Sequence, residues 1–366
     1  MRIAIDKNEL AQALDTVLKA VPTGKVTVQI LEGVLLTAGS GKLCITCNNL
    51  ESAIRLEIDC EVIQDGSVVV NSKLFNEIVK KMPNEELDIV TNEKEMSIEA
   101  GKTIMKLPLF KAEFPEMQTV IEKGRLVLDK ITFSELVSKV AFAVYVGEEK
   151  PVYTAIKIDV NAGEINVVAT DTYTLALQRK KIDAPDISVL LNGKSLEGIS
   201  KVITGEGTVK ISIGENIVVL NSDNIQASAR TVEGNFLDYN RWLSTKHETQ
   251  VQIDKRILMQ SLERAILVLE TGAKGSVVNA LKVSSTTDGL SLKNSGQKGS
   301  FDEKIPGGIK GSDFMIGVDP RRVIDCLKHI DAKEVVLNFS GEKTPLFITP
   351  VDGDDFVYII PLVRTR

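Results

Sequence analysis

The amino-acid sequence predicts an α+β fold in which one domain design occurs three times. Three Asp-Lys pairs, beginning at Asp6, Asp129 and Asp254, each open a segment whose apolar residues recur at helical spacing. After each helical segment come alternating strand runs, a strand that leads into a second helix, and further short strands. A chain of 366 residues is also too long for one comfortable hydrophobic core, so several domains are expected.

The first helix of each repeat is predicted over residues 6–20, 129–144 and 254–270. Each opening aspartate can accept hydrogen bonds from the unpaired amides of the first helical turn, and its charge favours the positive end of the helix dipole. Strand pairs are predicted next, over Gly33–Thr46, Ala155–Ala169 and Ala280–Lys293.

The second helix of each repeat follows an apolar strand and is predicted over residues 71–83, 193–204 and 318–330. Each repeat then closes with strand runs divided by turn residues, over Leu87–Pro108, Val209–Ser228 and Val335–Pro361. We therefore predict domains at 1–122, 123–247 and 248–366, each with two helices on one side of antiparallel sheets.

The composition is ordinary for a globular protein, with 43% apolar and 26% charged residues. No apolar run is long enough to predict a membrane span, and the start, MRIAIDKNEL, carries charge where a signal peptide needs an apolar stretch. These features predict a cytoplasmic protein without a membrane partner. Cys44 and Cys47 form a C-x-x-C within a strand pattern, which puts their thiols on opposite faces and favours a structural role.

The formal net charge of −6 argues against nucleic acid if it is taken as an average. The six predicted helices together carry +3, however, and the excess lies on the second helix of each repeat. Basic residues on one helix are usually a solvated face, but with the same bias in three related helices, loose contact with phosphates without base readout is an equal alternative.

Motifs that would predict catalysis or metal binding are incomplete. The NGKS string at Asn192–Ser195 imitates a phosphate-binding loop, yet Ser188 stands where that loop needs a glycine. Only two histidines exist, His247 and His329, in different repeats, and the acidic VDGDDF string fits a hairpin turn better than a calcium loop. We expect no catalytic residues, no metal and no cofactor. A phosphate-handling enzyme that uses NGKS stays open as the alternative.

Several strings together resemble the bacterial sliding clamp, the beta subunit of DNA polymerase III. They are NNLE (48–51), AEFPEM (112–117), VVATDTYTLA (167–176), RTVEGNFLDY (230–239) and VYIIPLVR (357–364), and they occur in order along the whole chain. The resemblance implies three clamp-type domains forming half of a ring (the DNA clamp fold), with helices lining a channel. Two rather than one chain would be needed, because twelve helices spaced about 10 Å apart leave a bore of about 28 Å, whereas six leave about 9 Å.

The resemblance also implies the partners: sequence-independent duplex DNA, a second copy in a homodimer, the polymerase catalytic subunit, the clamp loader and other proteins with clamp-binding motifs. It implies a processivity factor for DNA replication. A β-rich scaffold that binds no nucleic acid stays open as a further alternative.

Site residues carried over from the resemblance fall into three sets. The partner-peptide groove is expected at Tyr153, Thr170, Thr172, Tyr173, Thr174, Leu175, Leu237, Arg241, Trp242, Ile359, Ile360, Pro361, Leu362 and Val363. The DNA-facing residues are expected to be Lys25, Lys73, Lys80, Lys81, Lys194, Lys201, Arg321, Arg322 and Lys328. The dimer interface is expected to join Lys102–Leu107 to Arg264–Glu270, through Ile104, Met105, Leu107, Leu267 and Val268.

The chain departs from the family at two places in the groove. It has Thr172-Tyr173-Thr174 where the family usually has a Gly-His-Arg-like stretch, and Leu237 where the family usually has proline. Both departures bear on which peptide motif the groove prefers.

Overall fold

The computed structural model describes residues 1–366 apart from 22–27, 84–85, 273–276, 342–343, 352–354 and 365–366. The chain forms two compact units, Met1–Glu135 with Lys194–Val232, and Leu136–Gly193 with Glu233–Arg366. Lys25, expected to face DNA, and Asp352 and Asp354 of the acidic string lie outside the described residues. No helix in the described part of the chain is both long enough and apolar enough to cross a bilayer.

The first unit contains helices and strands of the first repeat and part of the second. Its helical elements are α1 (Lys7–Val17), η1 (Leu18–Ala20), η2 (Gln29–Glu32), α2 (Ser72–Lys81), α3 (Lys130–Ser138, which runs past the unit boundary) and α4 (Gly193–Ser200, which starts one residue before it). Its strands are β1 (Arg2–Asp6), β2 (Gly33–Gly39), β3 (Lys42–Asn48), β4 (Ser52–Asp59), β5 (Glu61–Gln64), β6 (Gly66–Asn71), β7 (Glu86–Thr91), β8 (Glu95–Ala100), β9 (Thr103–Pro108), β10 (Gly124–Asp129), β15 (Thr208–Ile213), β16 (Ile217–Ser222) and β17 (Ile225–Arg230).

The second unit contains the rest of the second repeat and the third repeat. Its helical elements are η3 (Ala141–Ala143), η4 (Pro151–Thr154), α5 (Asn240–Leu243), α6 (Lys255–Ile266) and α7 (Pro320–Leu327). Its strands are β11 (Ala155–Asn161), β12 (Glu164–Thr170), β13 (Leu175–Lys181), β14 (Ile187–Asn192), β18 (Thr249–Asp254), β19 (Leu281–Thr286), β20 (Gly289–Gly296), β21 (Gly299–Pro306), β22 (Gly308–Lys310), β23 (Met315–Val318), β24 (Glu334–Phe339), β25 (Leu346–Pro350) and β26 (Phe356–Ile360).

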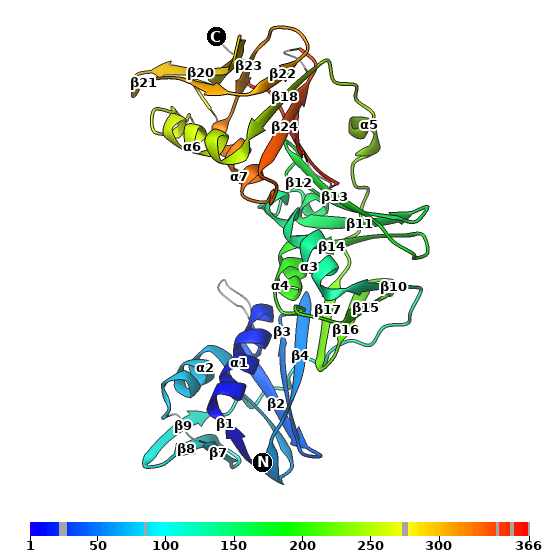
Figure 1. Cartoon of the computed structure of the whole chain (residues 1–366). Coiled ribbons are helices and arrows are strands. Elements are labelled where there is room, and N and C mark those ends of the chain that lie inside the picture. The colour runs from blue at the N-terminus through cyan, green and yellow to red at the C-terminus, as the bar shows by residue number, and fades with distance from the viewer. Residues whose placement is uncertain (22–27, 84–85, 273–276, 342–343, 352–354, 365–366) are drawn as a thin grey trace. The chain divides into compact units, whose positions relative to one another are not determined.

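The predicted repeat plan is confirmed, with two helices and short antiparallel strands in each repeat. Asp6 caps α1 by accepting hydrogen bonds from the amides of Asn8 (2.7 Å) and Glu9 (3.0 Å), and Asp254 caps α6 through the amide of Ile257 (2.9 Å). The apolar faces of α1, α2, α6 and α7 are buried, and α1 packs beside α2 as α6 packs beside α7 (Figure 1). The helices end several residues earlier than predicted, and the one-turn helix α5 was not predicted.

Two of the four sheets cross the boundaries between repeats. The eight-stranded sheet has the order β10-β15-β16-β17-β4-β3-β2-β6, so that β17 of the second repeat pairs with β4 of the first. The nine-stranded sheet has the order β14-β11-β12-β13-β26-β25-β24-β18-β22, so that β26 of the third repeat pairs with β13 of the second. Because these pairings join neighbouring repeats, the compact units do not coincide with the predicted domains, whose boundaries stay a prediction.

The other two sheets end in strands whose outer edges have no strand partner among the described residues. The five-stranded sheet has the order β5-β1-β7-β8-β9, and the four-stranded sheet has the order β21-β20-β19-β23. The outer edge of β23 is met by the C-terminal segment, because the Val363 amide donates to the Gly317 carbonyl at 2.8 Å. The outer edges of β9 and β21 are both long and exposed.

Two linker segments, one between β9 and β10 and one between β17 and β18, are held by side chains from the sequence strings that resemble the sliding clamp. The buried Asn48 amide donates to the carbonyls of Pro115 (3.1 Å) and Glu116 (3.4 Å), which ties the first linker to the turn after β3. In the second linker, the Tyr239 hydroxyl donates to the Asp159 carboxylate on β11 at 2.7 Å. Gly234, at φ 137°, leaves room for Val152, because an added Cβ would stand 2.3 Å from its side chain. NNLE, AEFPEM and RTVEGNFLDY thus each have a structural role.

The cysteines agree with the strand prediction. Cys47 is buried on one face of β3 and Cys44 is half-buried on the other, and both thiols are free. Burial raises the pKa of the Cys47 thiol well above its ordinary value, so it stays protonated and unreactive.

Candidate functional site

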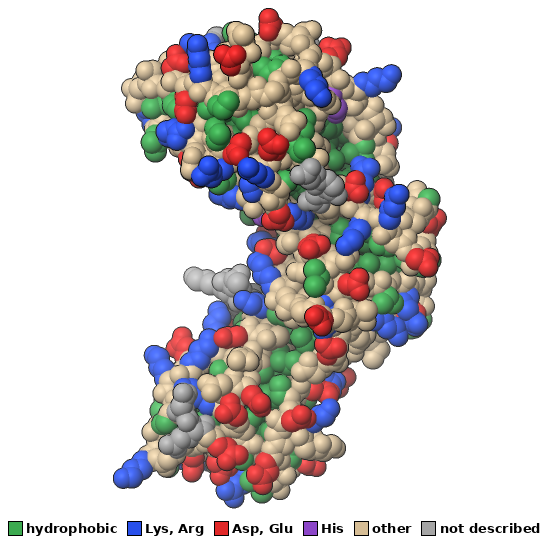
Figure 2. Space-filling model, in the orientation of Figure 1, with side chains coloured by type: hydrophobic (Ala, Val, Ile, Leu, Met, Phe, Trp, Pro, Cys, Tyr) green, Lys and Arg blue, Asp and Glu red, His purple; other side chains and the backbone are tan. Residues whose placement is uncertain are grey.

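The second helices of the three repeats present basic side chains to solvent. Lys73, Lys80 and Lys81 on α2 are exposed, as are Lys194 and Lys201 on or next to α4 and Lys328 at the end of α7. On the face drawn in Figure 2, Lys and Arg side chains gather over these helices, with Asp and Glu side chains among them. Arg321 is half-exposed and donates to Asp319, the cap of α7, at 2.8 Å.

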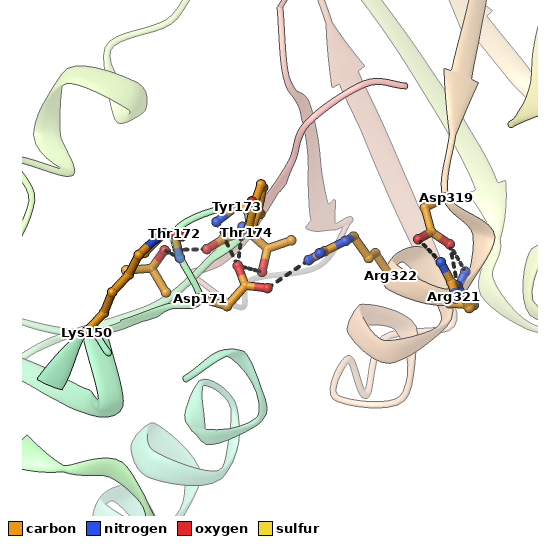
Figure 3. A network of polar contacts seen from close by, with 9 residues as sticks. Lys150, Asp171, Thr172, Tyr173, Thr174, Asp319, Arg321 and Arg322 are labelled. Carbon is orange, nitrogen blue, oxygen red and sulfur yellow. Dashed lines mark hydrogen bonds and ion pairs between the residues drawn. The ribbon is translucent and has the colours of Figure 1, made fainter. Parts of the chain in front are cut away.

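The turn between β12 and β13 is organised around one carboxylate, that of Asp171. It accepts hydrogen bonds from the amides of Tyr173 (2.8 Å) and Thr174 (2.6 Å) and from the Thr174 hydroxyl (3.0 Å). Thr172 adopts φ 76°, a conformation that favours glycine, and its hydroxyl accepts a hydrogen bond from Lys150 at 3.2 Å (Figure 3). Burial raises the pKa of Asp171, but the hydrogen bonds from Thr174, Arg322 and Tyr173 outweigh it and lower the pKa below its usual value.

Arg322 lies against this turn, although the sequence placed it among the DNA-facing residues. Its guanidinium donates to the Asp171 carboxylate at 2.8 Å and lies 5.6 Å from the centre of the Tyr173 ring (Figure 3). The side chain is therefore committed to the turn and groups with residues expected in the partner-peptide groove. Sequence reasoning missed this because the ion pair joins residues 151 positions apart.

An apolar cluster lies beside the turn and is built from three segments that are distant in sequence. Its buried members, which we call the 168–359 cluster, are Val168, Leu175, Leu177, Tyr239, Phe347 and Ile359. Partly buried side chains pack against the 168–359 cluster and leave some apolar surface exposed: Phe236, Leu237, Leu243 and Val357. The structure thus brings together Leu175, Leu237 and Ile359 from the expected groove.

The other residues expected in the groove differ in how far they are exposed and in what they contact. Tyr153 contacts Phe236 with ring centres 5.9 Å apart, and Trp242 is 41% exposed, which argues against core packing for it. Ile360 is buried and its side chain packs in the core, so its place in the groove stays a prediction. Thr170 is also buried, with its hydroxyl donating to the Thr174 carbonyl at 2.5 Å. Arg241 is exposed and pairs with Asp238 at 2.9 Å, and Pro361, Leu362 and Val363 are half-exposed.

His247 was missed as a neighbour of the 168–359 cluster. Its ring lies 4.5 Å from that of Phe347, and burial lowers the pKa of the imidazole, which favours the neutral form. Phe347, Leu177 and Leu243 were also missed. The alternation of Leu177 and Phe347 within strand patterns is the signal of burial, but it does not distinguish a core from a recognition surface.

The residues expected at a dimer interface lie on β9 and at the end of α6. Ile104 is 57% and Leu267 is 78% exposed, with Met105 and Val268 less so. Leu107 is buried within its own sheet opposite Met96, so its side chain packs in the core, and its place at a dimer interface stays a prediction. The sequence did not point to β21 as a neighbour of these residues. This strand packs against α6, and Arg264 and Ser261 both donate hydrogen bonds to its Glu303.

The NGKS string has a structural explanation. Gly193 begins α4 directly after β14, and an added Cβ would stand 2.6 Å from the Val144 side chain and 3.0 Å from the Thr154 carbonyl oxygen. Close packing therefore explains this glycine without a phosphate ligand.

Three helix-on-sheet repeats that share antiparallel sheets define a clamp-fold protein. Models of the DNA polymerase III beta subunit match the chain as its N-terminal domain over residues 1–118, its central domain over 127–238 and its C-terminal domain over 240–363. The chain therefore belongs to the DNA polymerase III beta subunit family, the beta sliding clamps, and is a non-catalytic processivity clamp of DNA replication.

Relatives match over the full length. The beta sliding clamp of Bacillus subtilis (strain 168) is 28% identical over 380 residues, covering all of both chains. Among solved structures, a putative DNA polymerase III beta subunit from Eubacterium rectale is 28% identical with a TM-score of 0.90, covering 99% of each chain. The DNA polymerase beta subunit of Streptococcus pyogenes is 25% identical with a TM-score of 0.92, covering 100% of each chain.

The Asp171–Arg322 pair generates a prediction about stability and pH. Asp171→Asn should lower the free energy of unfolding by about 1–3 kcal/mol at pH 7, because a partly buried guanidinium loses its charged acceptor. A carboxylate whose pKa is lowered by folding stabilises the fold above its unfolded pKa and ceases to do so as pH falls. The difference between wild type and variant in urea unfolding should therefore shrink below about pH 4.

A double-mutant cycle with Arg322→Gln is the control for this pair. The two substitutions should be strongly non-additive because they remove the same contact. Additive effects, or a difference that persists unchanged at pH 3, would show that the pair does not hold the turn.

Proposed function

We propose that two copies of the chain join head to tail into a ring around duplex DNA and tether partner proteins through the 168–359 cluster. The observation that carries this proposal is the way neighbouring repeats pair their sheets. In both junctions within the chain, the last strand of one repeat pairs antiparallel with the fourth strand of the repeat before it: β17 with β4, and β26 with β13. By the same rule β9, the last strand of the first repeat, needs the fourth strand of a preceding repeat.

β21 is the strand that fits this requirement. It is the fourth strand of the last repeat, and no strand pairs with its outer edge among the described residues. Because a long exposed strand edge is a template for pairing with another chain, β9 of one copy and β21 of another complete each other. Each chain then offers one edge of each kind, which makes the contact heterologous and lets two copies close a ring.

The two internal junctions also have the same register. Aligned on their strand pairings, Ala227 opposite Ile54 in one junction corresponds to Tyr358 opposite Ala176 in the other. The equivalent positions on the free edges are Met105 and Phe301. Both side chains are apolar and at least partly exposed, as a contact between copies requires. Leu267 and Val268, at the end of the helix that packs on β21, lie in the same part of the fold.

Helix number supports two copies rather than one. The six repeat helices of one chain could line a bore of only about 9 Å, whereas twelve line about 28 Å, and B-DNA is about 20 Å wide. We infer that the basic second helices face this channel and touch phosphates without reading bases. Lys73, Lys80, Lys81, Lys194, Lys201 and Lys328 are the described residues that we assign to this contact. The described Arg321 is assigned to it less directly, since it also bonds the cap Asp319.

The partner surface proposed here is the exposed side of the 168–359 cluster with the Asp171 turn at its edge. Apolar side chains there can anchor a Leu or Phe of an extended peptide, and the turn supplies polar groups beside them. The polymerase catalytic subunit, the clamp loader and other proteins with clamp-binding motifs are the proposed ligands, in the cytoplasm. Thr172, Tyr173 and Leu237 are the positions at which peptide preference should differ from that of relatives.

The ring predicts topological retention on DNA. After loading by a clamp loader, the wild-type protein should stay on a circular plasmid through gel filtration and leave within minutes of linearisation, because threading rather than affinity holds it. Ile104→Asp should abolish retention on the circle, since it buries a charge at the proposed junction.

Ile63→Asp provides the matched control, because Ile63 is similarly exposed on β5, the opposite edge strand of the same sheet. That variant should be retained like the wild type. Equal retention of wild type on linear and circular DNA would contradict encirclement.

The partner surface predicts a local effect on peptide affinity. Leu237→Ala should weaken binding of a peptide with adjacent Leu and Phe by about fivefold to tenfold in fluorescence anisotropy, because about 1 kcal/mol of apolar contact is lost. Ile121→Ala, at an apolar side chain that is 88% exposed and belongs to the other compact unit, is the control and should bind like wild type. Unchanged affinity in Leu237→Ala would exclude this surface.

A further inference from the structure

A lysine of the second helix forms an ion pair with a carboxylate in every repeat. Lys80 on α2 pairs with Asp15 of α1 at 2.6 Å. Lys201, next to α4, pairs with Glu197 of that helix at 2.6 Å, and Lys328 at the end of α7 lies 3.8 Å from Asp325. Three repeats with different local sequences thus place an acid beside a lysine that we assign to DNA contact.

The pair in the first repeat is held by a further contact. The Asn76 side-chain amide of α2 donates to the same Asp15 oxygen at 2.9 Å, so the carboxylate bridges two neighbouring helices. Burial raises the pKa of Asp15, but the hydrogen bonds from Lys80 and Asn76 outweigh it, and the carboxylate stays ionised at neutral pH. In the second repeat, Glu197 and Lys201 are four positions apart on one helical face, which is the spacing at which such pairs form.

The three ion pairs are exposed to solvent, and this exposure determines how strongly each carboxylate holds its lysine. Each side chain in the three pairs retains roughly half of its exposure, so the attraction within a pair is screened by water and weak. A DNA phosphate can therefore displace the carboxylate from the lysine. To do so it must compete with the carboxylate for the ammonium group, and the nearby carboxylate charge repels it. Lys73, Lys81 and Lys194, in contrast, form no ion pair within the described residues.

We propose that Asp15, Glu197 and Asp325 attenuate the attraction of the channel for DNA, so that a closed ring moves freely along the duplex. This inference rests on the proposed function. A ring that is held by threading does not need strong phosphate contacts, and each strong contact would slow its movement, because the phosphate attraction sets non-specific affinity. The paired lysines then guide the duplex without holding it.

The test is a variant in which the three acids are neutralised, Asp15→Asn with Glu197→Gln and Asp325→Asn. With a short linear duplex, which cannot be encircled permanently, its affinity at low salt should rise about tenfold over wild type in fluorescence anisotropy. The dependence of log K on log salt should steepen by up to about 0.9 for each lysine that gains a phosphate. On circular DNA, single-molecule tracking should show slower diffusion of the loaded variant.

The control is Glu57→Gln with Asp88→Asn and Glu215→Gln, which changes the net charge equally. These acids pair with Arg55, Arg2 and Lys123, outside the six repeat helices. The control should bind DNA nearly as wild type does. Equal tightening in both triple variants would show that net charge alone acts, and no tightening in either would also overturn the proposal.

A single substitution guards against loss of folding. Glu197→Gln removes a pair within one helix face, leaves the helix contacts of Asp15 untouched, and should tighten linear-duplex binding about twofold to fivefold. Retention of the wild type on circular DNA reports on encirclement independently. If the wild type is retained and Glu197→Gln binds unchanged, attenuation is wrong while the ring stands.

Discussion

Backbone groups at the edge of a β-sheet need hydrogen-bond partners, and the organisation of this chain follows from how its repeats meet that need. One junction joins four strands of one repeat to four of the next and the other joins four to five, so that neighbouring repeats share a continuous sheet. The same rule leaves the outer edges of β9 and β21 without a strand partner among the described residues. The proposed ring is therefore the continuation of an internal pattern, with the contact between copies built like the contact between repeats.

If strand pairing closes a ring around DNA, the rest of the protein surface does not need high affinity for DNA. Since topology would supply the hold on DNA, the helices need only weak and sequence-independent attraction, and the charge pattern agrees with this division. The chain carries a net charge of −6, while its basic side chains gather on the second helices and several are matched by nearby carboxylates. In the proposed ring, specific recognition is left to the 168–359 cluster, where a linker, two strands of one repeat and two of the next meet.

Local patterns predicted the parts of the fold that depend on neighbouring residues. The caps at Asp6 and Asp254, the amphipathic helices and the strand of Cys44 and Cys47 all follow from spacing within a few positions. Pairings such as β17 with β4 could not be predicted, because partners about 170 residues apart leave no periodic signal. For the same reason Arg322 was grouped with the DNA-facing lysines, although it pairs with Asp171 at the turn, and Leu107 was expected at the dimer interface, although its own sheet buries its side chain.

The register of the proposed junction gives the most direct test of the account. Met105→Cys combined with Phe301→Cys should form a disulfide between two copies under mild oxidation, and non-reducing electrophoresis should show a dimer closed at both junctions. Moving one cysteine by two positions, as Met105→Cys with Glu303→Cys, should cross-link far less, since directly opposed positions lie closest across a strand pair. Equal cross-linking in both variants, or none in the first while the protein is dimeric, would contradict the shared-sheet junction.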